Sequence, residues 1–277
     1  MKIYISADME GTAGVCSWEQ CDPSNVAEYP IYRRYMSREV RAAIDGAREG
    51  GATEFVINDS HWDMRNLLWD ELPDDVRVIS GGRKPLSMSQ GYGPGFAGAL
   101  FTGYHGKAGE AGATLAHTYT SDSIFNVTIN GTVCSEATLN AAFAGVYGIP
   151  LLMVSGDATI VRDVRAQMPW VAGVAVKDAI GYYAADSLTP QAACGAIRAG
   201  ARDAVARAAE ARPFVFEPPV AMEIELARVE CADFVELMPD FVRIGGRTVR
   251  FVAPDYPSAY GAFVAAFRIA GAALVRA

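Results

Sequence analysis

The sequence lacks features that mark several classes of protein. Basic residues are in the minority, with 24 Lys and Arg against 32 Asp and Glu and a net charge of −8. We therefore expect no binding to nucleic acid. No short repeat or sustained heptad is present, which excludes collagen-like and coiled-coil folds. With 51% hydrophobic and 20% charged residues among 277, the chain can bury a sizeable core.

Long apolar runs and patterned cysteines are also missing. The stretch 141–154 is interrupted by two glycines and a proline, and the stretch 263–275 is shorter than the roughly 20 residues that a bilayer requires. The chain turns acidic at Asp8, before the apolar core of a signal peptide develops. The sequence predicts no membrane association and a cytoplasmic location. Reduced thiols are expected at the five scattered cysteines, which are Cys16, Cys21, Cys134, Cys194 and Cys231.

Apolar runs of strand length alternate with helical patterns over most of the chain. A helix is expected over residues 37–49. This alternation predicts an α/β fold with a mostly parallel central sheet flanked by helices. The expected strands of that sheet are 3–5, 54–57, 76–79, 99–104 and 151–154.

A hairpin and a change of composition interrupt the alternation. Residues 125–133 predict a hairpin, because Asn130-Gly131 at its centre suits a type I′ turn. Ser135 can then cap a helix. Thr189-Pro190 opens a long helix to about Ala211.

The last part of the chain has a different pattern. Residues 222–226 alternate like a half-exposed strand, residues 248–252 resemble another, and an amphipathic helix ends the sequence. We expect an α/β domain over residues 1–213 and a smaller α+β part over residues 214–277.

Acidic and imidazole side chains follow the predicted strands. If the first strand stays extended, Asp8 and Glu10 point to the same face and need a proton or a cation between them. Asp8 as a turn cap with a solvated Glu10 is the alternative. His61 and His105 each follow a strand, at the edge where α/β sheets bind ligands. Carboxylates and imidazoles without thiolate suit zinc, manganese or iron.

Two further residues have open roles on spacing alone. Glu136 begins the helix after the hairpin, where a carboxylate either interacts with the helix dipole or binds a metal. His117 lies in a short segment that resembles a strand. It fits a metal ligand, a proton donor or a packed imidazole equally well.

The candidate residues lie in five motifs, which are SADMEG at 6–11, NDSH at 58–61, GYH at 103–105, AH at 116–117 and SEATLN at 135–140. Together these motifs resemble the D-aminopeptidase family of binuclear zinc peptidases. The resemblance extends through residues 84–88 and 153–157 into the C-terminal part, and so covers nearly the whole chain. Several motifs in the same order are far more specific than Asp-x-Glu-Gly alone.

The resemblance implies a set of roles. Asp8 bridges two zinc ions, with Glu10 and His61 on one ion and His105 and Glu136 on the other. His117 stands beside them as a catalytic residue that is not a ligand. The implied reaction is hydrolysis of the N-terminal peptide bond of short peptides with D-amino acids, by water shared between the ions. Manganese or cobalt are possible substitutes for zinc.

The resemblance also implies a ring-shaped homo-oligomer, expected to be a decamer, around an internal chamber. Cys134 stands where the family pattern leads us to expect glycine, so its thiol is expected near the metal site. Asn58 and Asp59 are candidates to orient His61, with turn formation as their alternative. Lys84 is expected to be solvated.

Two other functions fit the residues. Paired metal ions serve amidohydrolases and phosphoesterases equally well, although the sequence has no phosphate-binding loop. A non-catalytic metal-binding assembly protein is the second possibility. A structural zinc usually closes its four ligands, whereas five candidate ligands and an additional histidine indicate an open, catalytic site.

Overall fold

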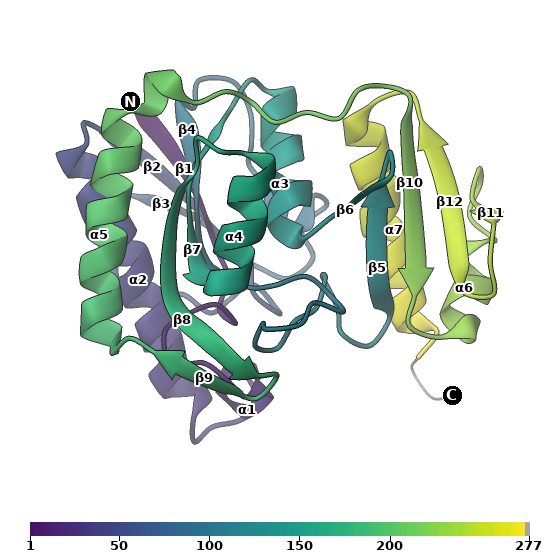
Figure 1. Ribbon diagram of the computed structural model, residues 1–277, viewed down its shortest axis with the longest axis horizontal. Helices are drawn as coiled ribbons and strands as arrows, with labels where there is room; N and C mark the ends of the chain where they lie inside the picture. The colour runs from purple at the N-terminus through teal and green to yellow at the C-terminus, as the bar shows by residue number, and fades with distance from the viewer. Residues whose placement is uncertain (275–277) are drawn as a thin grey trace.

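Seven strands form the larger of two sheets, which lies beside the smaller one (Figure 1). The computed structural model describes residues 1–274. The strand order is β3-β2-β1-β4-β7-β8-β9, and only the β8–β9 pair is antiparallel. The expected mostly parallel sheet is confirmed. Its strands are β1 (Lys2–Ala7), β2 (Glu54–Asp59), β3 (Arg77–Ile79), β4 (Gly98–Tyr104), β7 (Leu151–Asp157), β8 (Ala172–Gly181) and β9 (Ala184–Ser187).

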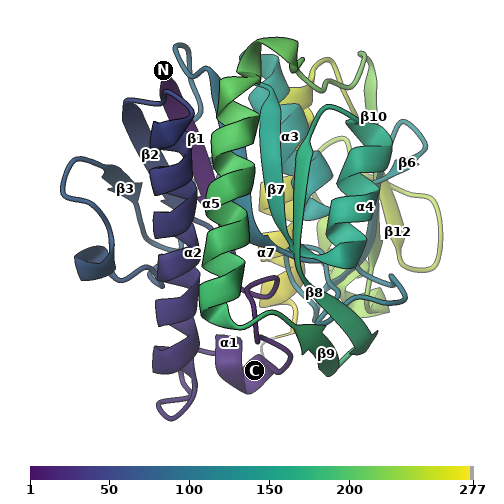
Figure 2. The same cartoon turned by 60° about the vertical axis from the view of Figure 1, so that its left-hand side comes forward.

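Helices cover both faces of this sheet. Figure 2 shows α2 (Tyr29–Glu49) and α5 (Pro190–Ala206) side by side over one face, while α3 (Glu136–Val146) and α4 (Ala158–Gln167) cover the other. Ile3 and Ile5 pack in the core beneath α2 and α5, whereas Tyr4 packs in the core with α3. Both faces of β1 are therefore buried, as a central parallel strand requires. The shorter helices are α1 (Trp18–Cys21), η1 (Trp69–Glu71), η2 (Ser87–Ser89) and η3 (Ala208–Glu210).

A second, antiparallel sheet lies beside the first, in the order β11-β12-β10-β5-β6. The alternating residues of β10 bury one face of it against α7, in a core that includes Met222, Ile224 and Phe263. The Tyr256 hydroxyl donates a hydrogen bond to the Leu139 carbonyl, which ties α7 to α3. The elements are β5 (Ile124–Ile129), β6 (Thr132–Val133), β10 (Val220–Leu226), α6 (Val229–Val235), β11 (Val242–Arg243), β12 (Thr248–Ala253) and α7 (Tyr256–Ala272).

The two parts expected from composition share this second sheet. Strands β5 and β6 precede residue 213, and β10, β11 and β12 follow it. Strand β5 pairs directly with β10 in antiparallel register. The division into 1–213 and 214–277 stays a prediction.

Local signals in the sequence place several elements correctly. The hairpin turn has positive φ at both Asn130 (48°) and Gly131 (82°), as a type I′ turn requires. The Ser135 side chain accepts a hydrogen bond from the Thr138 backbone and caps α3. All five cysteines are free, as expected.

The boundaries of two helices differ from those expected. Helix α2 begins at Tyr29 rather than residue 37, because Pro30 at its first turn fixes a helical φ. Helix α5 ends at Ala206 rather than near Ala211, where the chain tightens into the 3-10 helix η3. Within residues 1–274, no helix has both the length and the apolar character needed to cross a bilayer.

Gly46 lies where α2 touches α5, which predicts how this contact responds to substitution. A Cβ at Gly46 would lie 2.0 Å from the Arg198 carbonyl oxygen. Gly46→Ala should lower the free energy of unfolding by about 1–3 kcal/mol, the usual cost of overpacking. Exposed Gly195 of α5 is the control, because its Cβ would meet nothing within 4 Å. Gly195→Ala should raise stability by about 0.5–1 kcal/mol. Urea unfolding measures both changes, and a neutral Gly46→Ala would contradict the steric argument.

Candidate metal centre

The candidate residues meet at the carboxyl ends of β1, β2 and β4. The strand order reverses between β1 and β4, and ligands bind beside such a reversal in open α/β sheets. Asp8 and Glu10 follow β1, His61 follows β2, and His105 follows β4. Each of these four residues is no more than 3% exposed. The expected convergence of strand ends is confirmed.

The reason why Asp8 and Glu10 converge differs from the one expected. Strand β1 ends at Ala7, so the extended conformation does not continue through residue 10. The loop instead folds onto β4: the Asp8 backbone N–H donates to the Thr102 carbonyl at 2.9 Å, and that of Gly11 donates to Gly103 at 2.7 Å. This approach requires glycine at position 11, where a Cβ would lie 1.8 Å from the Tyr104 oxygen.

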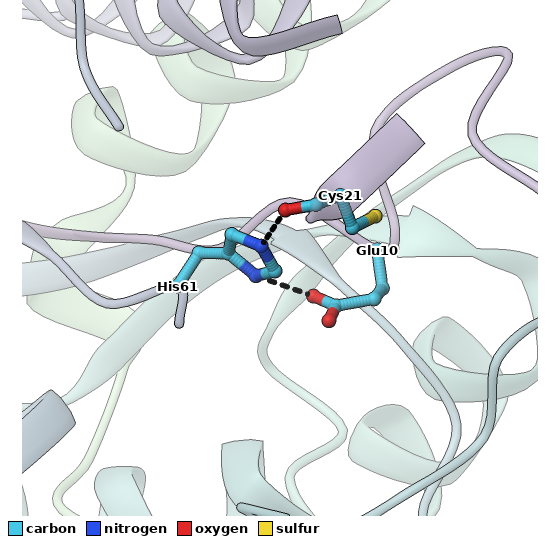
Figure 3. A group of neighbouring side chains, drawn as sticks. All are labelled: Glu10, Cys21 and His61. Carbon is cyan, nitrogen blue, oxygen red and sulfur yellow. Dashed lines mark hydrogen bonds and ion pairs between the residues drawn. The ribbon is translucent and has the colours of Figure 1, made fainter. Parts of the chain in front are cut away.

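His61 contacts both carboxylates through one nitrogen of its ring. Its Nδ1 lies 2.9 Å from Glu10 Oε2 and 3.5 Å from Asp8 Oδ1. Its Nε2 lies 2.9 Å from the Cys21 carbonyl oxygen, which accepts a hydrogen bond from it (Figure 3). A backbone carbonyl on one ring nitrogen leaves the other free to bind a metal, as is usual for ligating imidazoles.

The residues expected to orient the His61 ring have other partners. Asp59 accepts hydrogen bonds from the backbone N–H groups of Asn66 (2.6 Å) and Leu67 (2.8 Å) and from the Asn66 amide (2.8 Å). The Asn66 amide also donates to the His61 carbonyl at 2.6 Å. Asp59 therefore stabilises the loop that carries His61 and does not orient the His61 ring.

Asn58 and Lys84 also lie apart from the ring. The Asn58 amide donates to the Met88 carbonyl at 2.7 Å. Lys84 is buried, and its ammonium donates to Asn58 Oδ1 and the Asp59 carbonyl. Burial lowers the pKa of Lys84 to about 8. The expectation of a solvated lysine is wrong, because these strand-end acceptors draw it inward.

His105 and Glu136 form the other side of the cluster. His105 Nε2 lies 3.5 Å from Asp8 Oδ2 and 3.7 Å from Glu136 Oε2, and its Nδ1 donates to the Gly106 carbonyl at 3.0 Å. The second oxygen of Glu136 accepts the Tyr119 backbone N–H at 2.5 Å. Asp8 thus lies between the two histidines, with one oxygen toward each.

His117 faces the same space from a loop. The segment expected to resemble a strand is irregular, and Leu115 has a φ of 51°. The His117 ring stacks on His105 with centroids 4.2 Å apart, and its Nδ1 donates to the Leu115 carbonyl at 2.9 Å. Its Nε2 lies 3.9 Å from Glu10 Oε1 and 3.8 Å from Glu136 Oε1. His117 therefore points one free nitrogen at the carboxylates.

The buried carboxylates and imidazoles shift one another's pKa. Burial and then the charge of Glu10 raise the pKa of Asp8. Burial alone would raise the pKa of Glu10, but the imidazoles, His61 foremost, hold it well below its ordinary value. Burial alone would lower the pKa of His105, but Glu136 and Asp8 hold it well above its ordinary value. The carboxylates thus need positive charge among them, which a divalent cation supplies.

Two orphaned atoms test whether a metal fits this cluster. Within residues 1–274, Asp8 Oδ2 and His105 Nε2 are buried and have no hydrogen-bond partner. They lie 3.5 Å apart, and buried polar atoms without partners are costly. Ligand atoms of Asp8, Glu10 and His105 lie within 4.8 Å of one another, as do those of His105, His117 and Glu136. The residues present fit a divalent metal.

The thiol beside the cluster is Cys21 and not Cys134. Cys134 is buried, and its thiol donates to the Thr132 carbonyl at 3.3 Å. The expectation that it approaches the metal site is wrong, because its side chain turns back into the hairpin. Ligand atoms of Glu10, Cys21 and His61 instead lie within 4.8 Å of one another (Figure 3). No local pattern in the sequence signals this contact, because α1 reaches the site through tertiary packing.

A cavity of about 280 Å³ opens onto the cluster. It reaches from the strand ends to α7, so the C-terminal helix contributes to its wall. Aromatic side chains supply much of the apolar lining. The wall contains Asp8, Glu10, Trp18, Ser60, His61, Trp62, Met64, Gly82, Ser87, Met88, His117, Tyr119, Thr120, Ser121, Asp122, Glu136, Phe267 and Arg268.

The model of the family described as D-aminopeptidase (Peptidase_M55) matches residues 1–265 of this sequence. The chain belongs to the D-aminopeptidase family. The D-aminopeptidase of Bacillus subtilis (strain 168) is 35% identical over 268 residues, covering 95% of this chain and 96% of the relative. The family resemblance seen in the sequence motifs is therefore confirmed.

A solved structure shares the fold of this D-aminopeptidase family member. It is described as a "Zn-dependent D-aminopeptidase DppA from Bacillus subtilis, a self-compartmentalizing protease". The TM-score is 0.94 at 33% identity, and 98% of each chain is covered. The match therefore includes both sheets and the loops that carry the cluster.

The role assigned to Asp59 predicts a cost in stability when its charge is removed. Asp59→Asn turns one acceptor oxygen into a donor facing the donors of Asn66 and Leu67. The free energy of unfolding should fall by about 1–3 kcal/mol. Asp70→Asn, at an exposed position of η1, is the matched control and should change little. Urea unfolding compares the two, and equal stability of both variants would remove Asp59 from this role.

Proposed function

We propose that this protein is a zinc-dependent aminopeptidase that hydrolyses the N-terminal peptide bond of short peptides containing D-amino acids. The observation that carries the proposal is the buried cluster in which Asp8 lies between His61 and His105. The Zn-dependence and D-aminopeptidase activity named for the relatives support the metal and the substrate. Manganese and cobalt are the substitutes that the same donor set would accept.

Two zinc ions per chain would be held by five residues in this proposal. Asp8 would bridge the ions, because its two oxygens face different histidines. Glu10 and His61 would complete one site, and His105 and Glu136 the other. The backbone carbonyl of Cys21 accepts the Nε2–H of His61, and that of Gly106 accepts the Nδ1–H of His105. This supports metal binding through the other nitrogens, His61 Nδ1 and His105 Nε2.

When bound, paired divalent ions would lower the pKa of a water molecule to about 7 and polarise a carbonyl oxygen. His117 would act beside them as an acid–base or hydrogen-bonding group. Its Nδ1 is occupied by the Leu115 carbonyl, so Nε2 is the nitrogen that can hold or release a proton toward the substrate. Stacking on His105 fixes the plane of the His117 ring. Trp18 also packs edge-on against it, with centroids 5.3 Å apart.

The proposed assembly is a ring-shaped homo-oligomer, a decamer by family resemblance. The description of DppA as self-compartmentalizing supports it. A closed ring would place the active sites in a chamber and admit only short peptides. A cytoplasmic location stays a prediction, supported by five free thiols.

The substrate class is tested by a panel of compounds on the zinc-loaded protein. D-aminoacyl dipeptides should be hydrolysed with release of the N-terminal residue, and L-aminoacyl dipeptides more slowly. Aryl phosphates measure the phosphoesterase alternative, and simple amides the amidohydrolase alternative. Turnover of phosphates with none of peptides would refute the aminopeptidase.

The bridging role of Asp8 predicts the metal content. The purified protein should hold about two divalent ions per chain, and Asp8→Ala should lose much of both, because its carboxylate is assigned to each ion. Elemental analysis after gel filtration gives the ratio. Asp122→Ala is a matched control, since this carboxylate lines the cavity outside the cluster. Full metal content in Asp8→Ala would show that the assignment is wrong.

Substitution of two stacked histidines separates catalysis from metal binding. His117→Asn should keep both ions while kcat falls about 10²–10⁴-fold, the usual contribution of a positioned acid–base group. KM should change much less, because the interaction is assigned to the transition state. His105→Asn should lose metal and regain activity in excess zinc. If His117→Asn releases an ion and recovers with zinc, His117 is a ligand and the catalytic role belongs elsewhere.

A further inference from the structure

The cavity at the metal centre adjoins a second depression that is lined by basic residues. Both are lined by Thr120, Phe267 and Arg268, so they meet along α7. The first cavity contains the carboxylates assigned to zinc, which are Asp8, Glu10 and Glu136, together with Asp122. The charged residues that line the second are all basic, and they are Arg83, Lys84 and Arg268.

Arg268 is held at the border between these two spaces. Its Nη2 donates to the Gly82 carbonyl at 3.0 Å, and its guanidinium lies 5.2 Å from the centroid of the Phe267 ring. Within residues 1–274 it makes this one hydrogen bond and no ion pair. A guanidinium has five N–H donors, so most of them remain for a ligand. Its planar fork suits a carboxylate, which it can bind through two parallel hydrogen bonds.

The neighbouring basic residues differ in what they can offer. Arg83 is exposed and lines the same depression as Arg268. Lys84 is buried, and its ammonium donates to Asn58 and to the Asp59 carbonyl. The free positive charge of this depression therefore comes from the two arginines.

A short peptide ends in a free carboxylate, which complements this positive charge. We propose that Arg268, assisted by Arg83, binds the free C-terminal carboxylate of the peptide whose N-terminal residue is held at the metal centre. This inference rests on the proposed function and names the substrate more closely. Each added residue extends a peptide by about 3.3–3.6 Å, so the length of the peptide determines whether its carboxylate reaches Arg268.

Removing the charge at either end of the contact tests the inference. A D-aminoacyl dipeptide is compared with its C-terminal amide, which lacks the negative charge. The wild-type protein should prefer the free acid by about 10-fold or more in kcat/KM, the effect of one charge-assisted hydrogen bond. In Arg268→Gln this preference should fall to about twofold, mainly through a higher KM for the acid. Arg268→Lys should keep part of the preference.

Arg77→Gln is the control, because Arg77 is exposed on the edge strand β3 and lines neither depression. It should keep the full preference for the acid. Equal use of acid and amide by the wild-type protein, or an unchanged preference in Arg268→Gln, would overturn the inference.

Calorimetric binding separates this inference from the proposed function. The zinc-loaded His117→Asn variant should bind the acid about 10-fold more tightly than the amide, and adding Arg268→Gln should remove the difference. If the wild-type protein hydrolyses neither peptide, the aminopeptidase fails while these affinities still decide the role of Arg268. Equal affinities for acid and amide would refute it even in an active enzyme.

Discussion

The burial of three carboxylates against three imidazoles is the constraint on which the rest of the structure depends. Asp8, Glu10 and Glu136 are each less than 5% exposed, and carboxylates so placed repel one another unless positive charge lies among them. The parallel sheet supplies the position, because β1, β2 and β4 end at one edge. Backbone carbonyls supply the orientation by accepting one N–H from each histidine, at Cys21, Gly106 and Leu115.

The antiparallel sheet completes the centre that the parallel sheet begins. Its β5–β6 hairpin leads directly into α3, whose first residue is Glu136. The loop before β5 carries His117 and the Tyr119 N–H that binds the Glu136 carboxylate. Helix α7, packed under the same sheet, closes the far wall of the cavity with Phe267 and Arg268. The two sheets therefore form one functional unit, although their strand patterns differ.

Features set by residues close in sequence can be predicted here, whereas contacts between residues far apart in sequence cannot. The strands near Ile3, Phe55 and Leu151, the Asn130-Gly131 turn and the Ser135 cap follow from local patterns, and so does the gathering of carboxylates and histidines at strand ends. Local patterns predict neither strands β8 and β9 nor helix α4. In β8, buried and exposed side chains do not alternate regularly. The contact of Cys21 with His61 and the burial of Lys84 depend on tertiary packing. Local patterns therefore find the chemical groups, while folding determines their partners.

The central claim is that Asp8 joins two metal sites, and X-ray diffraction at the zinc edge tests it most directly. Crystals grown with zinc would be measured on both sides of the absorption edge. The account predicts two anomalous peaks about 3.5–4 Å apart, one beside Glu10 and His61 and the other beside His105 and Glu136, with the Asp8 carboxylate between them. A single peak, or a pair of peaks that Asp8 does not bridge, would contradict it.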